Sequence, residues 1–414
     1  MKLYKRIISK EIKPFIKRKE AILIKGTRRV GKTSLLHLLE NALIKDLKIA
    51  KEKIYFFDLE ELDIREDFND NPRNLLKYVS DTRGRKYVFI DEIQYLDNPA
   101  NFLKILVDHY PDLKIFATGS SSLDIKRKIQ DSLIGRVVYF QLYPLNFTEF
   151  LSFKNKNFSL QVTPNQKKQL DRLLEEYLLF GGMPEIVLEQ NVKLKKELLK
   201  NYINLYVSKD IRNLVEIDNI GSFNKLIKIL SSQTGCLLEK NEVSNTLDIA
   251  FKTLNRYLDI LQHTFIIILL SPYFANLRSK LTKTPKIYFY DIGIRNSLFN
   301  NFNKIEFRID KGALFENFIF LELLSKFGSE DISFYRTTKQ TEIDFIIESR
   351  KMAVEVKCKK YKEKKVFKAF DSFKEFDNKI VNLNFNSKNT GYSFIDWWKF
   401  LKQLDTTDKT NLSF

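Results

Sequence analysis

Short apolar segments alternate with longer amphipathic segments in the first third of the chain. Five of the short segments are rich in β-branched and aromatic residues: AILIK (21–25), KIYFFDL (53–59), KYVFID (86–91), LKIFATG (113–119) and RVVYFQL (136–142). Amphipathic stretches such as 32–47 and 101–109 lie between some of them. This alternation predicts an α/β fold in which helices cover a parallel sheet.

The pattern becomes helical from about residue 165 to 260. Two long amphipathic stretches, 166–180 and 193–214, are followed by a set of shorter helices. From about residue 285 strand-like segments return, so the C-terminal part is again expected to be α/β. The end of the chain after residue 403 is polar and is expected to fray.

Composition narrows the class of partner. The 414 residues carry a formal net charge of +18, which favours nucleic acid first and an anionic membrane surface second. The alternative is that a Lys-rich composition only maintains solubility. The N-terminus lacks the apolar core of a signal peptide, and the longest apolar run, Phe265 to Leu270, is too short to span a bilayer. We therefore expect a soluble cytoplasmic protein without a membrane partner.

The segment GTRRVGKT, from Gly26 to Thr33, follows a predicted strand and opens a predicted helix. This context is that of a P-loop, in which backbone amides and a helix N-terminus face phosphate oxygens. Lys32 would reach the β- and γ-phosphates of ATP, and the Thr33 hydroxyl would bind Mg²⁺. The nucleotide contacts are expected from one continuous run: Gly26, Thr27, Arg28, Arg29, Val30, Gly31, Lys32, Thr33 and Ser34.

Two further predicted strands end in polar residues that complete such a site. KYVFIDE places Asp91 where it would hold Mg²⁺ and Glu92 where it would polarise the attacking water. LKIFATGSSS ends in hydroxyls, of which Ser120 or Ser121 could contact the γ-phosphate or the water. The alternative for these serines is a simple turn.

The order GTRRVGKT, VFIDE, ATGSSS and IGRVVYFQLYPLNFTEF resembles the AAA-type ATPases that are joined to a domain of unassigned function numbered 4143. The resemblance implies that Arg136, just before the last core strand, is an arginine finger, and that the protein could form a homo-oligomer. FGGMPEIV (180–187) is similar to the Gly-x-Pro element that abuts adenine in related signalling ATPases, which assigns Gly182 and Pro184 to that role. A simple helix break is the alternative for this element.

The segment 238–273 resembles a winged helix-turn-helix. Apolar stripes are supplied by Val243, Leu247, Leu254, Tyr257, Leu258 and Leu261. The recognition-like helix would run from Phe251 to Gln262 with Lys252, Asn255 and Arg256 facing outward. Such helices often read DNA, and they also serve as protein–protein packing modules.

The segment EIDFIIESRKMAVEVK (342–357) reads as a hairpin with its tip at Ser349 and Arg350. Residues whose numbers sum to 699 then face each other, so Asp344 opposes Glu355. In the same register Ile343, Phe345 and Ile347 are expected on one apolar face. Two opposed carboxylates repel, so either the face is wet and nearby lysines neutralise it, or a divalent cation lies between the acids.

A third carboxylate, Glu316, lies in the predicted helix 312–327 on the stripe that faces the core. A helix with an inward Glu, followed by Asp344 and by Glu355-x-Lys357, resembles the PD-(D/E)xK nuclease fold, with Ile343 where the proline of the motif would stand. The resemblance implies that Glu316, Asp344 and Glu355 bind Mg²⁺ or Mn²⁺ and that Lys357 assists catalysis. The alternative is a nuclease-like scaffold that only binds.

The whole chain is thus expected to have five parts. They are a P-loop AAA-type ATPase core (1–155), a helical lid (156–210), a winged-helix region (211–280), a restriction-endonuclease-like α/β domain (281–402) and a polar tail (403–414). The predicted function is ATP hydrolysis coupled to nucleic-acid binding, and whether metal-dependent DNA cleavage accompanies it is left open. The alternative is an ATP-driven signalling or assembly switch whose nuclease-like domain is a non-catalytic binding module.

Overall fold

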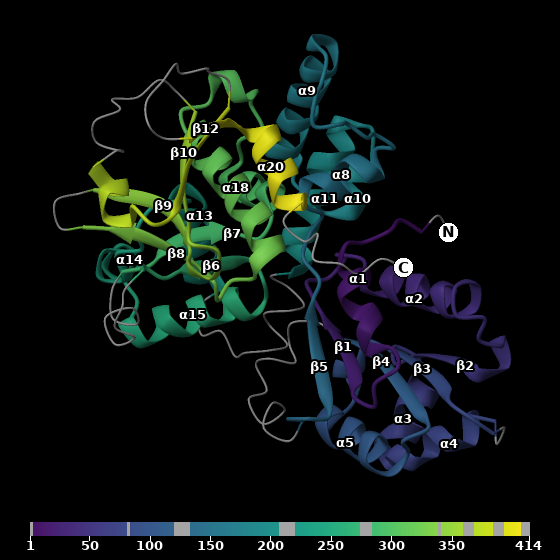
Figure 1. The fold of residues 1–414 in the computed structure, drawn as a ribbon. Helices are drawn as coiled ribbons and strands as arrows, with labels where there is room; N and C mark the ends of the chain where they lie inside the picture. The colour runs from purple at the N-terminus through teal and green to yellow at the C-terminus, as the bar shows by residue number, and fades with distance from the viewer. Residues whose placement is uncertain are drawn as a thin grey trace.

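The computed structural model describes residues 3–80, 83–119, 133–206, 220–273, 284–337, 341–358, 368–383 and 393–406. Figure 1 shows an N-terminal sheet with flanking helices in purple and blue, a group of teal helices above it, and a C-terminal region in green and yellow beside them. No helix within these ranges combines the length and the apolar character needed to cross a membrane.

The N-terminal sheet has five parallel strands in the order β2-β3-β4-β1-β5. The strands are β1 (Ala21–Lys25), β2 (Ile54–Asp58), β3 (Lys86–Asp91), β4 (Leu113–Gly119) and β5 (Val137–Gln141). The five predicted strands are therefore confirmed. The inner strands β1, β3 and β4 are buried almost throughout, which explains why they read as continuous apolar runs.

Helices cover both faces of this sheet. The elements are α1 (Ile8–Ile12), η1 (Lys13–Phe15), α2 (Lys32–Lys45), η2 (Lys51–Lys53), α3 (Leu62–Asp70), η3 (Pro72–Asn74), α4 (Leu75–Tyr78), η4 (Ile93–Tyr95) and α5 (Pro99–His109). Side chains of α1 and α2 share one core with the sheet, and those of α3, α4 and α5 share the other. The result is a three-layer α/β/α unit in which both faces of the sheet are dry.

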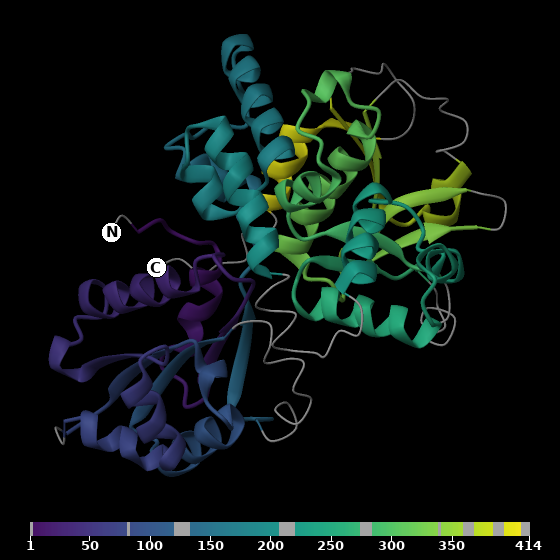
Figure 2. The same ribbon diagram turned by 180° about the vertical axis from the view of Figure 1, so that it is seen from behind.

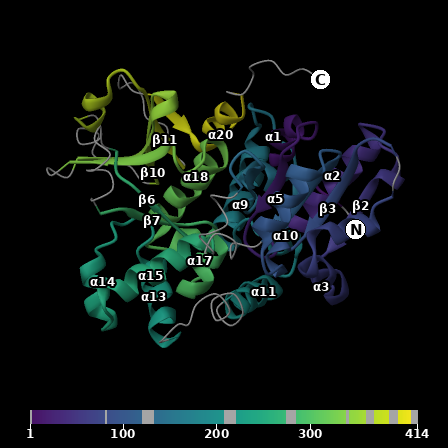
Figure 3. The same cartoon turned by 90° about the horizontal axis from the view of Figure 1, so that it is seen from below.

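Four helices follow and lie between the two sheets, as Figures 2 and 3 show. They are α8 (Phe147–Phe153), α9 (Pro164–Phe180), α10 (Pro184–Leu188) and α11 (Val192–Leu205). The start of α9 is fixed by a capping box in which Thr163 and Gln166 each accept the other's backbone N–H. We call α9, α10 and α11, which fall within the segment 156–210, the lid.

Three helices and two strands come next among the described residues. The elements are α13 (Ile220–Ser232), α14 (Lys240–Leu247), α15 (Phe251–His263), and the antiparallel strands β6 (Ile267–Leu270) and β7 (Lys286–Phe289). The predicted apolar stripes of α14 and α15 are buried. Lys252 and Arg256 face outward as predicted, whereas Asn255 is only partly exposed and accepts a 2.8 Å hydrogen bond from Lys240 Nζ.

The C-terminal region contains a mixed five-stranded sheet in the order β12-β11-β10-β9-β8. Its elements are α17 (Ile292–Phe299), η6 (Ile305–Phe307), α18 (Lys311–Phe327), β8 (Ile332–Arg336), β9 (Glu342–Ile347), η7 (Glu348–Arg350), β10 (Met352–Lys357), η8 (Asp371–Phe373), β11 (Asp377–Asn382), β12 (Ser393–Asp396) and α20 (Trp397–Thr406). Neighbours from β8 to β10 are antiparallel, and β10, β11 and β12 are parallel. The packing of α18 against β8, β9 and β10 covers one face.

The predicted hairpin register is confirmed, because Met352 pairs with Ile347 and Val354 pairs with Phe345. One detail of the prediction is wrong. Ile343 shares a core with Ile346, on the side of the sheet away from Phe345 and Ile347. A register shift between β8 and β9 interrupts the alternation of side chains at this point.

The predicted polar tail begins too early. The final helix α20 continues to Thr406, and Leu404 within it is buried. Trp397, Leu401 and Leu404 are all buried and follow a helical spacing, which the prediction did not extend past residue 402.

The turn between α9 and α10 joins the lid to the C-terminal region. Gly181 ends α9 with φ +75°, and the Gly182 N–H donates to the Asp291 carboxylate over 2.7 Å. On its other side, the Gly182 carbonyl accepts the Leu145 N–H over 2.8 Å. We call Gly181, Gly182 and Asp291 the glycine latch.

We expect Gly182→Ala to lower the free energy of unfolding by ~1–3 kcal/mol, because overpacking a filled site forces neighbours apart. An added Cβ would lie 2.2 Å from the Leu145 carbonyl oxygen, which is backbone and cannot rotate away. Gly312→Ala is the matched control, since nothing lies within 4 Å of its Cβ position in α18. Thermal unfolding followed by circular dichroism measures both, and equal midpoints for the two variants would contradict the expectation.

Candidate functional site

The P-loop connects β1 to α2 at the carboxyl edge of the N-terminal sheet. Two glycines are required by geometry here: a Cβ on Gly26 would lie 2.6 Å from the Leu142 carbonyl oxygen, and Gly31 has φ +97°. Arg29 also has positive φ, at 60°. The loop is therefore curled, so that the amides at the start of α2 face the loop's interior.

Lys32 lies within this curl and is 4% exposed. Its Nζ contacts the carbonyl oxygens of Gly26 and Thr27 at 3.4 and 3.2 Å and lies 3.7 Å from Glu92 Oε1. Most of these contacts are to neutral carbonyls, so the ammonium charge is only partly compensated. A buried cation beside amide donors suits phosphate oxygens.

Asp91 and Thr33 come together from the end of β3 and the first turn of α2. The Thr33 hydroxyl donates to Asp91 Oδ2 over 2.5 Å, and the Thr118 hydroxyl of β4 donates to the other carboxylate oxygen. Burial is the largest effect on Asp91 and raises the pKa of its carboxyl above the usual range. A hydroxyl and a buried carboxylate are oxygen ligands that Mg²⁺ accepts, so the donor set fits a nucleotide-bound Mg²⁺.

Glu92 adopts a left-handed backbone conformation, with φ 55°. Its N–H donates to Thr118 Oγ1 over 3.0 Å, and its carboxylate accepts from Gln94 and faces Lys32. The sequence did not single out Thr118, although it ends the same apolar strand that was expected to contribute hydroxyls. Ser120 and Ser121, the predicted hydroxyls, lie outside the described residues.

Arg6 braces the P-loop from outside and was missed by sequence analysis. Its guanidinium donates to the Val30 carbonyl over 3.1 Å, to the Tyr143 carbonyl over 2.7 Å and to Glu149 Oε1 over 3.0 Å. Arg6 and Glu149 are both about 7% exposed, so this is a buried ion pair. One basic residue among several near the start of the chain gives no signal for such a role, because its partners are 24 to 143 positions away.

The lid reaches the P-loop through α10. The Pro184 ring lies 3.9 Å from the Cβ position of Gly31, and Arg29 forms a 3.1 Å ion pair with Glu185. Of the two residues assigned to a Gly-x-Pro element, Pro184 thus lies beside the P-loop, whereas Gly182 packs into the glycine latch. The segment 181–185, which includes the start of α10, therefore contacts both the P-loop and the C-terminal region.

Arg136 lies at the opposite edge of the sheet. Its carbonyl accepts the N–H of Ala21, the first residue of β1, and its guanidinium pairs with Asp108 of α5 over 2.7 Å. The P-loop begins at the other end of β1, roughly 16 Å away for a five-residue strand. Arg136 therefore cannot reach the P-loop of its own chain.

The four residues predicted at the C-terminal site are brought together. Asp344 accepts the Val356 N–H over 2.8 Å, and Glu355 accepts the Asp344 N–H over 3.2 Å and pairs with Lys357. Glu316 of α18 is connected to Asp344 through Lys286, which contacts both carboxylates. Asp344 and Glu355 are 6% and 5% exposed, so the face is not wet as one of the two alternatives required, although lysines do lie beside both acids.

Lys286, the first residue of β7, occupies the centre of this group and was missed by sequence analysis. Its Nζ lies 2.5 Å from Glu342 Oε1, 3.2 Å from Glu316 Oε1 and 3.4 Å from Asp344 Oδ1. Tyr288, two residues later on the same face, donates to Glu316 over 2.6 Å. We call the group of Glu316, Glu342, Asp344, Glu355, Lys286 and Lys357 the carboxylate cluster.

Burial is the largest single effect on the pKa of four members of the carboxylate cluster: Glu316, Glu355, Lys286 and Lys357. It raises the pKa of Glu316 and of Glu355, and the nearby Asp344 charge raises both further. Burial alone would lower the pKa of Lys286, but Glu316, Asp344 and Glu342 outweigh it, and the net pKa is raised. Lys286 is therefore charged at neutral pH.

A divalent metal does not fit the cluster as it is arranged. The ammonium of Lys286 already lies against the oxygens of Glu316 and Asp344 that a metal would need. In the described part of the chain, no group of three or more His, Cys, Asp or Glu side chains is arranged to hold a metal ion.

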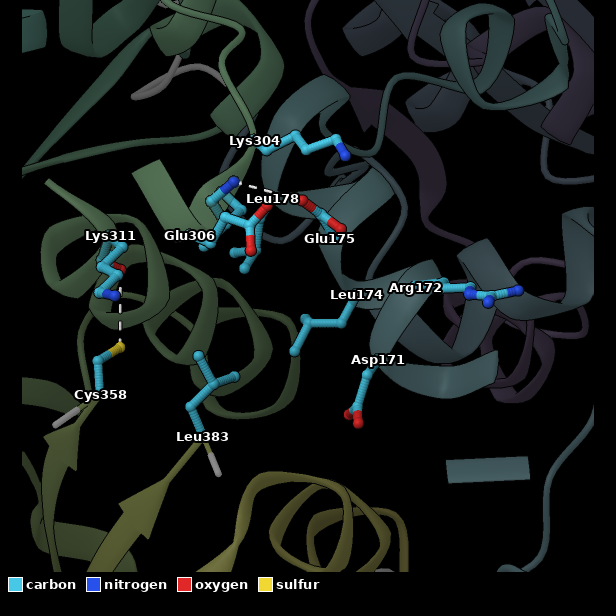
Figure 4. Close-up of a pocket in the computed structure, with 11 residues that line it drawn as sticks. Asp171, Arg172, Leu174, Glu175, Leu178, Lys304, Glu306, Lys311, Cys358 and Leu383 are labelled. Carbon is cyan, nitrogen blue, oxygen red and sulfur yellow. Dashed lines mark hydrogen bonds between the residues drawn. The ribbon is translucent and has the colours of Figure 1, made fainter. Parts of the chain in front are cut away.

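A separate cavity of about 380 Å³ lies between α9 and the C-terminal region, as Figure 4 shows. Its walls include Asp171 and Glu175 from α9, and Lys311 and Cys358 from the C-terminal region. Acidic and basic residues are mixed there, and no residue predicted for either site lines it. The cavity thus belongs to neither site.

Family comparisons divide the chain into three matched segments. Residues 18–151 match an AAA domain, residues 171–305 match the domain of unknown function DUF8612, and residues 311–401 match the domain of unknown function DUF4143. The structure of the Aeropyrum pernix ORC2 protein aligns with 64% of this chain and 88% of its own, with a TM-score of 0.39 and 11% identity.

Two relatives come from an archaeon and a bacterium. A protein of Haemophilus influenzae, named only as an uncharacterized protein, is 28% identical over 78% of this chain and 78% of its own length. The Methanocaldococcus jannaschii protein named uncharacterized protein MJ1544 is 31% identical over 83% of this chain and 75% of its own length. On this evidence the chain belongs to the same family as MJ1544, and it carries an AAA domain followed by a DUF4143 domain.

Proposed function

We propose that the protein hydrolyses ATP at the P-loop and uses the nucleotide state to control nucleic-acid binding by the region after residue 220. The observation that carries the proposal is the position of the turn 181–185. It contacts the P-loop through Pro184 and Glu185 and the C-terminal region through Gly182. Hydrolysis or release of the nucleotide could therefore be transmitted through this turn to the region that would bind nucleic acid.

At the ATP site, each residue has a role that its position supports. Lys32 would bind the β- and γ-phosphates, and Thr33 and Asp91 would hold Mg²⁺, which neutralises charge on the transferred phosphoryl group. Glu92 would orient the attacking water. Its carboxylate faces Lys32 at 3.7 Å, so it is close to where the γ-phosphate would lie.

The lid would sense the nucleotide through side chains at its rim. Arg29 and Glu185 form an ion pair whose side chains are 43% and 46% exposed, so the pair is weak. The phosphates of bound ATP would compete with the Glu185 carboxylate for the Arg29 guanidinium, and Glu185 would be released. The glycine latch would pass the resulting movement of α10 to α17, because Gly182 and Asp291 share a buried hydrogen bond.

Nucleic-acid binding is supported by charge and by element order. The chain carries a net charge of +18, and α14, α15, β6 and β7 follow one another as in a winged helix. Lys252 and Arg256 face outward from α15, where they could contact phosphates. The order α18, β8, β9, β10 and β11, antiparallel and then parallel, supports a nuclease-like fold for the C-terminal domain.

The second candidate is an ATP-driven assembly switch in which the nuclease-like domain binds without cleaving. The position of Lys286 favours it, since this lysine lies among the acids that cleavage would require to hold a metal. Cleavage would instead require the metal site predicted at Glu316, Asp344 and Glu355, with Lys357 beside it.

The two candidates separate in an ATPase assay on single-stranded, duplex and branched DNA. For the first, we expect at least one DNA to stimulate turnover, and the stimulation to fall steeply between about 50 and 200 mM salt. A protein that binds no DNA at low salt and shows no stimulation would instead support the second candidate.

We expect Lys252→Ala with Arg256→Ala to weaken DNA binding and to lower the salt slope by about 2, because each lost phosphate contact removes about one unit. Lys168→Ala with Arg172→Ala is the matched control, since it removes the same charge from an exposed face of α9. Fluorescence anisotropy at several salt concentrations measures both. An equal loss in the two double variants would mean that α15 has no special role.

We expect Glu92→Gln to keep ATP binding and to lose about 10²-fold or more in turnover, because the water loses its orienting carboxylate. Lys32→Ala should instead abolish tight binding, because the phosphates lose their buried cation. Binding of a fluorescent ATP analogue and phosphate release distinguish the two effects. Hydrolysis at the unaltered rate in Glu92→Gln would refute the role of Glu92.

We expect Arg136→Ala to reduce hydrolysis and to spare ATP affinity, provided that Arg136 acts on the site of a second subunit. Lys104→Ala, on the exposed face of α5, is the control for charge on the same surface. Sedimentation with an ATP analogue gives the oligomeric state. A strict monomer at concentrations where turnover is fast would exclude a finger acting in trans.

A further inference from the structure

The carboxylate cluster contains its own cation. We propose that the Lys286 ammonium is the resident cation between Glu316 and Asp344 and that it excludes Mg²⁺ and Mn²⁺ from this position. The inference concerns the C-terminal domain and does not depend on ATP hydrolysis. It assigns the cluster to holding two parts of the chain together.

The contacts of Lys286 are those of a bound ion. Three carboxylates from two elements, α18 and β9, lie within 3.4 Å of its Nζ. The residue is 2% exposed, so water does not compete for the charge. Burying an ammonium is costly unless it is paired and hydrogen-bonded, and these three acids supply that pairing.

The backbone fixes this lysine in place. Lys286 pairs with Leu270 of β6 and forms a bridge with Leu237, so its strand is held on two sides. The ammonium also lies 5.5 Å from the centre of the Phe334 ring. Tyr288 holds Glu316 from the same face of β7. The backbone of Lys286 is therefore fixed beside the cluster, and its ammonium is held there by the three carboxylates and the Phe334 ring.

A metal and this ammonium cannot share the position. Mg²⁺ binds carboxylate oxygens at ~2.0–2.1 Å and Ca²⁺ at ~2.3–2.6 Å. An ion bound to Glu316 Oε1 and Asp344 Oδ1 would lie next to the Nζ that already touches both oxygens. Like charges at such a distance in a dry environment repel strongly.

The remaining charges are also accounted for. Lys357 pairs with Glu355, and Arg336 lies 3.5 Å from the second oxygen of Glu342. Asp344 Oδ2 and Glu355 Oε2 accept backbone N–H groups. Each carboxylate of the cluster thus has partners without a metal.

The test is Mn²⁺ binding, followed by electron paramagnetic resonance of the free ion. All proteins carry Lys32→Ala, which keeps the P-loop from contributing a nucleotide-dependent site. We expect the protein with Lys286 and its Asp344→Asn variant to bind Mn²⁺ equally. We expect Lys286→Met to gain one site that is at least about tenfold tighter. Adding Asp344→Asn to Lys286→Met should abolish that site.

Lys379→Met is the matched control, because it removes a lysine from β11 of the same sheet, where its partner is Asp377. It should gain no Mn²⁺ site. Circular dichroism confirms that each variant is folded. A folded Lys286→Met protein that gains no Asp344-dependent site would overturn the proposal.

Comparing Mn²⁺ binding by the protein with Lys286 and by its Asp344→Asn variant tests the proposal even if Lys286→Met does not fold. Mn²⁺ binding that is lost in Asp344→Asn would mean that the cluster takes a metal beside Lys286, and the proposal would be wrong. Equal binding supports it. DNA-stimulated ATP hydrolysis is measured separately, so failure of the proposed function and failure of this inference give different results.

Discussion

The buried carboxylate of Asp291 is the interaction on which the arrangement of the molecule depends. It accepts the N–H groups of Gly182 and Ile294 and is 2% exposed. Burial raises its pKa to about 6, although these backbone donors act in the opposite direction. Leaving a buried acceptor unpaired costs about 1–3 kcal/mol of folding free energy. Since water does not reach Asp291, its hydrogen bond to Gly182 holds the lid and α17 together.

This contact gives the ATP site and the C-terminal region a common element. The turn after α9 is only a few residues long, and its two ends face different sites. Pro184 and Glu185 lie at the P-loop, and Gly182 lies at Asp291. The closely packed Gly182 thus places the start of α10 beside Asp291, the residue that precedes α17. The carboxylate cluster acts only within the region after residue 220, where Lys286 of β7 pairs with acids on α18 and β9.

Local patterns were enough for much of this description. The strands of the N-terminal sheet, the P-loop and the Asp91–Glu92 pair could be read directly, because an apolar run and its terminal polar residues lie within a few positions of one another. The hairpin register followed from the alternation in 342–357, as the pairing of Val354 with Phe345 confirms. The face assigned to Ile343 was wrong, because β9 has one extra residue between two pairings with β8: Ser333 pairs with Ile346, and Tyr335 pairs with Ile343.

The sequence by itself determined which residues carry charge, where strands and helices form, and that acids in 316–355 converge. Only the tertiary structure decided how those charges are balanced. Lys286 lies 30 residues from Glu316 and 58 from Asp344, and nothing in its own strand marks it as their partner. Arg6 and Asp291 are similar cases. A buried charge is stabilised by whichever group is nearest in space, and that proximity is set by the packing of distant elements.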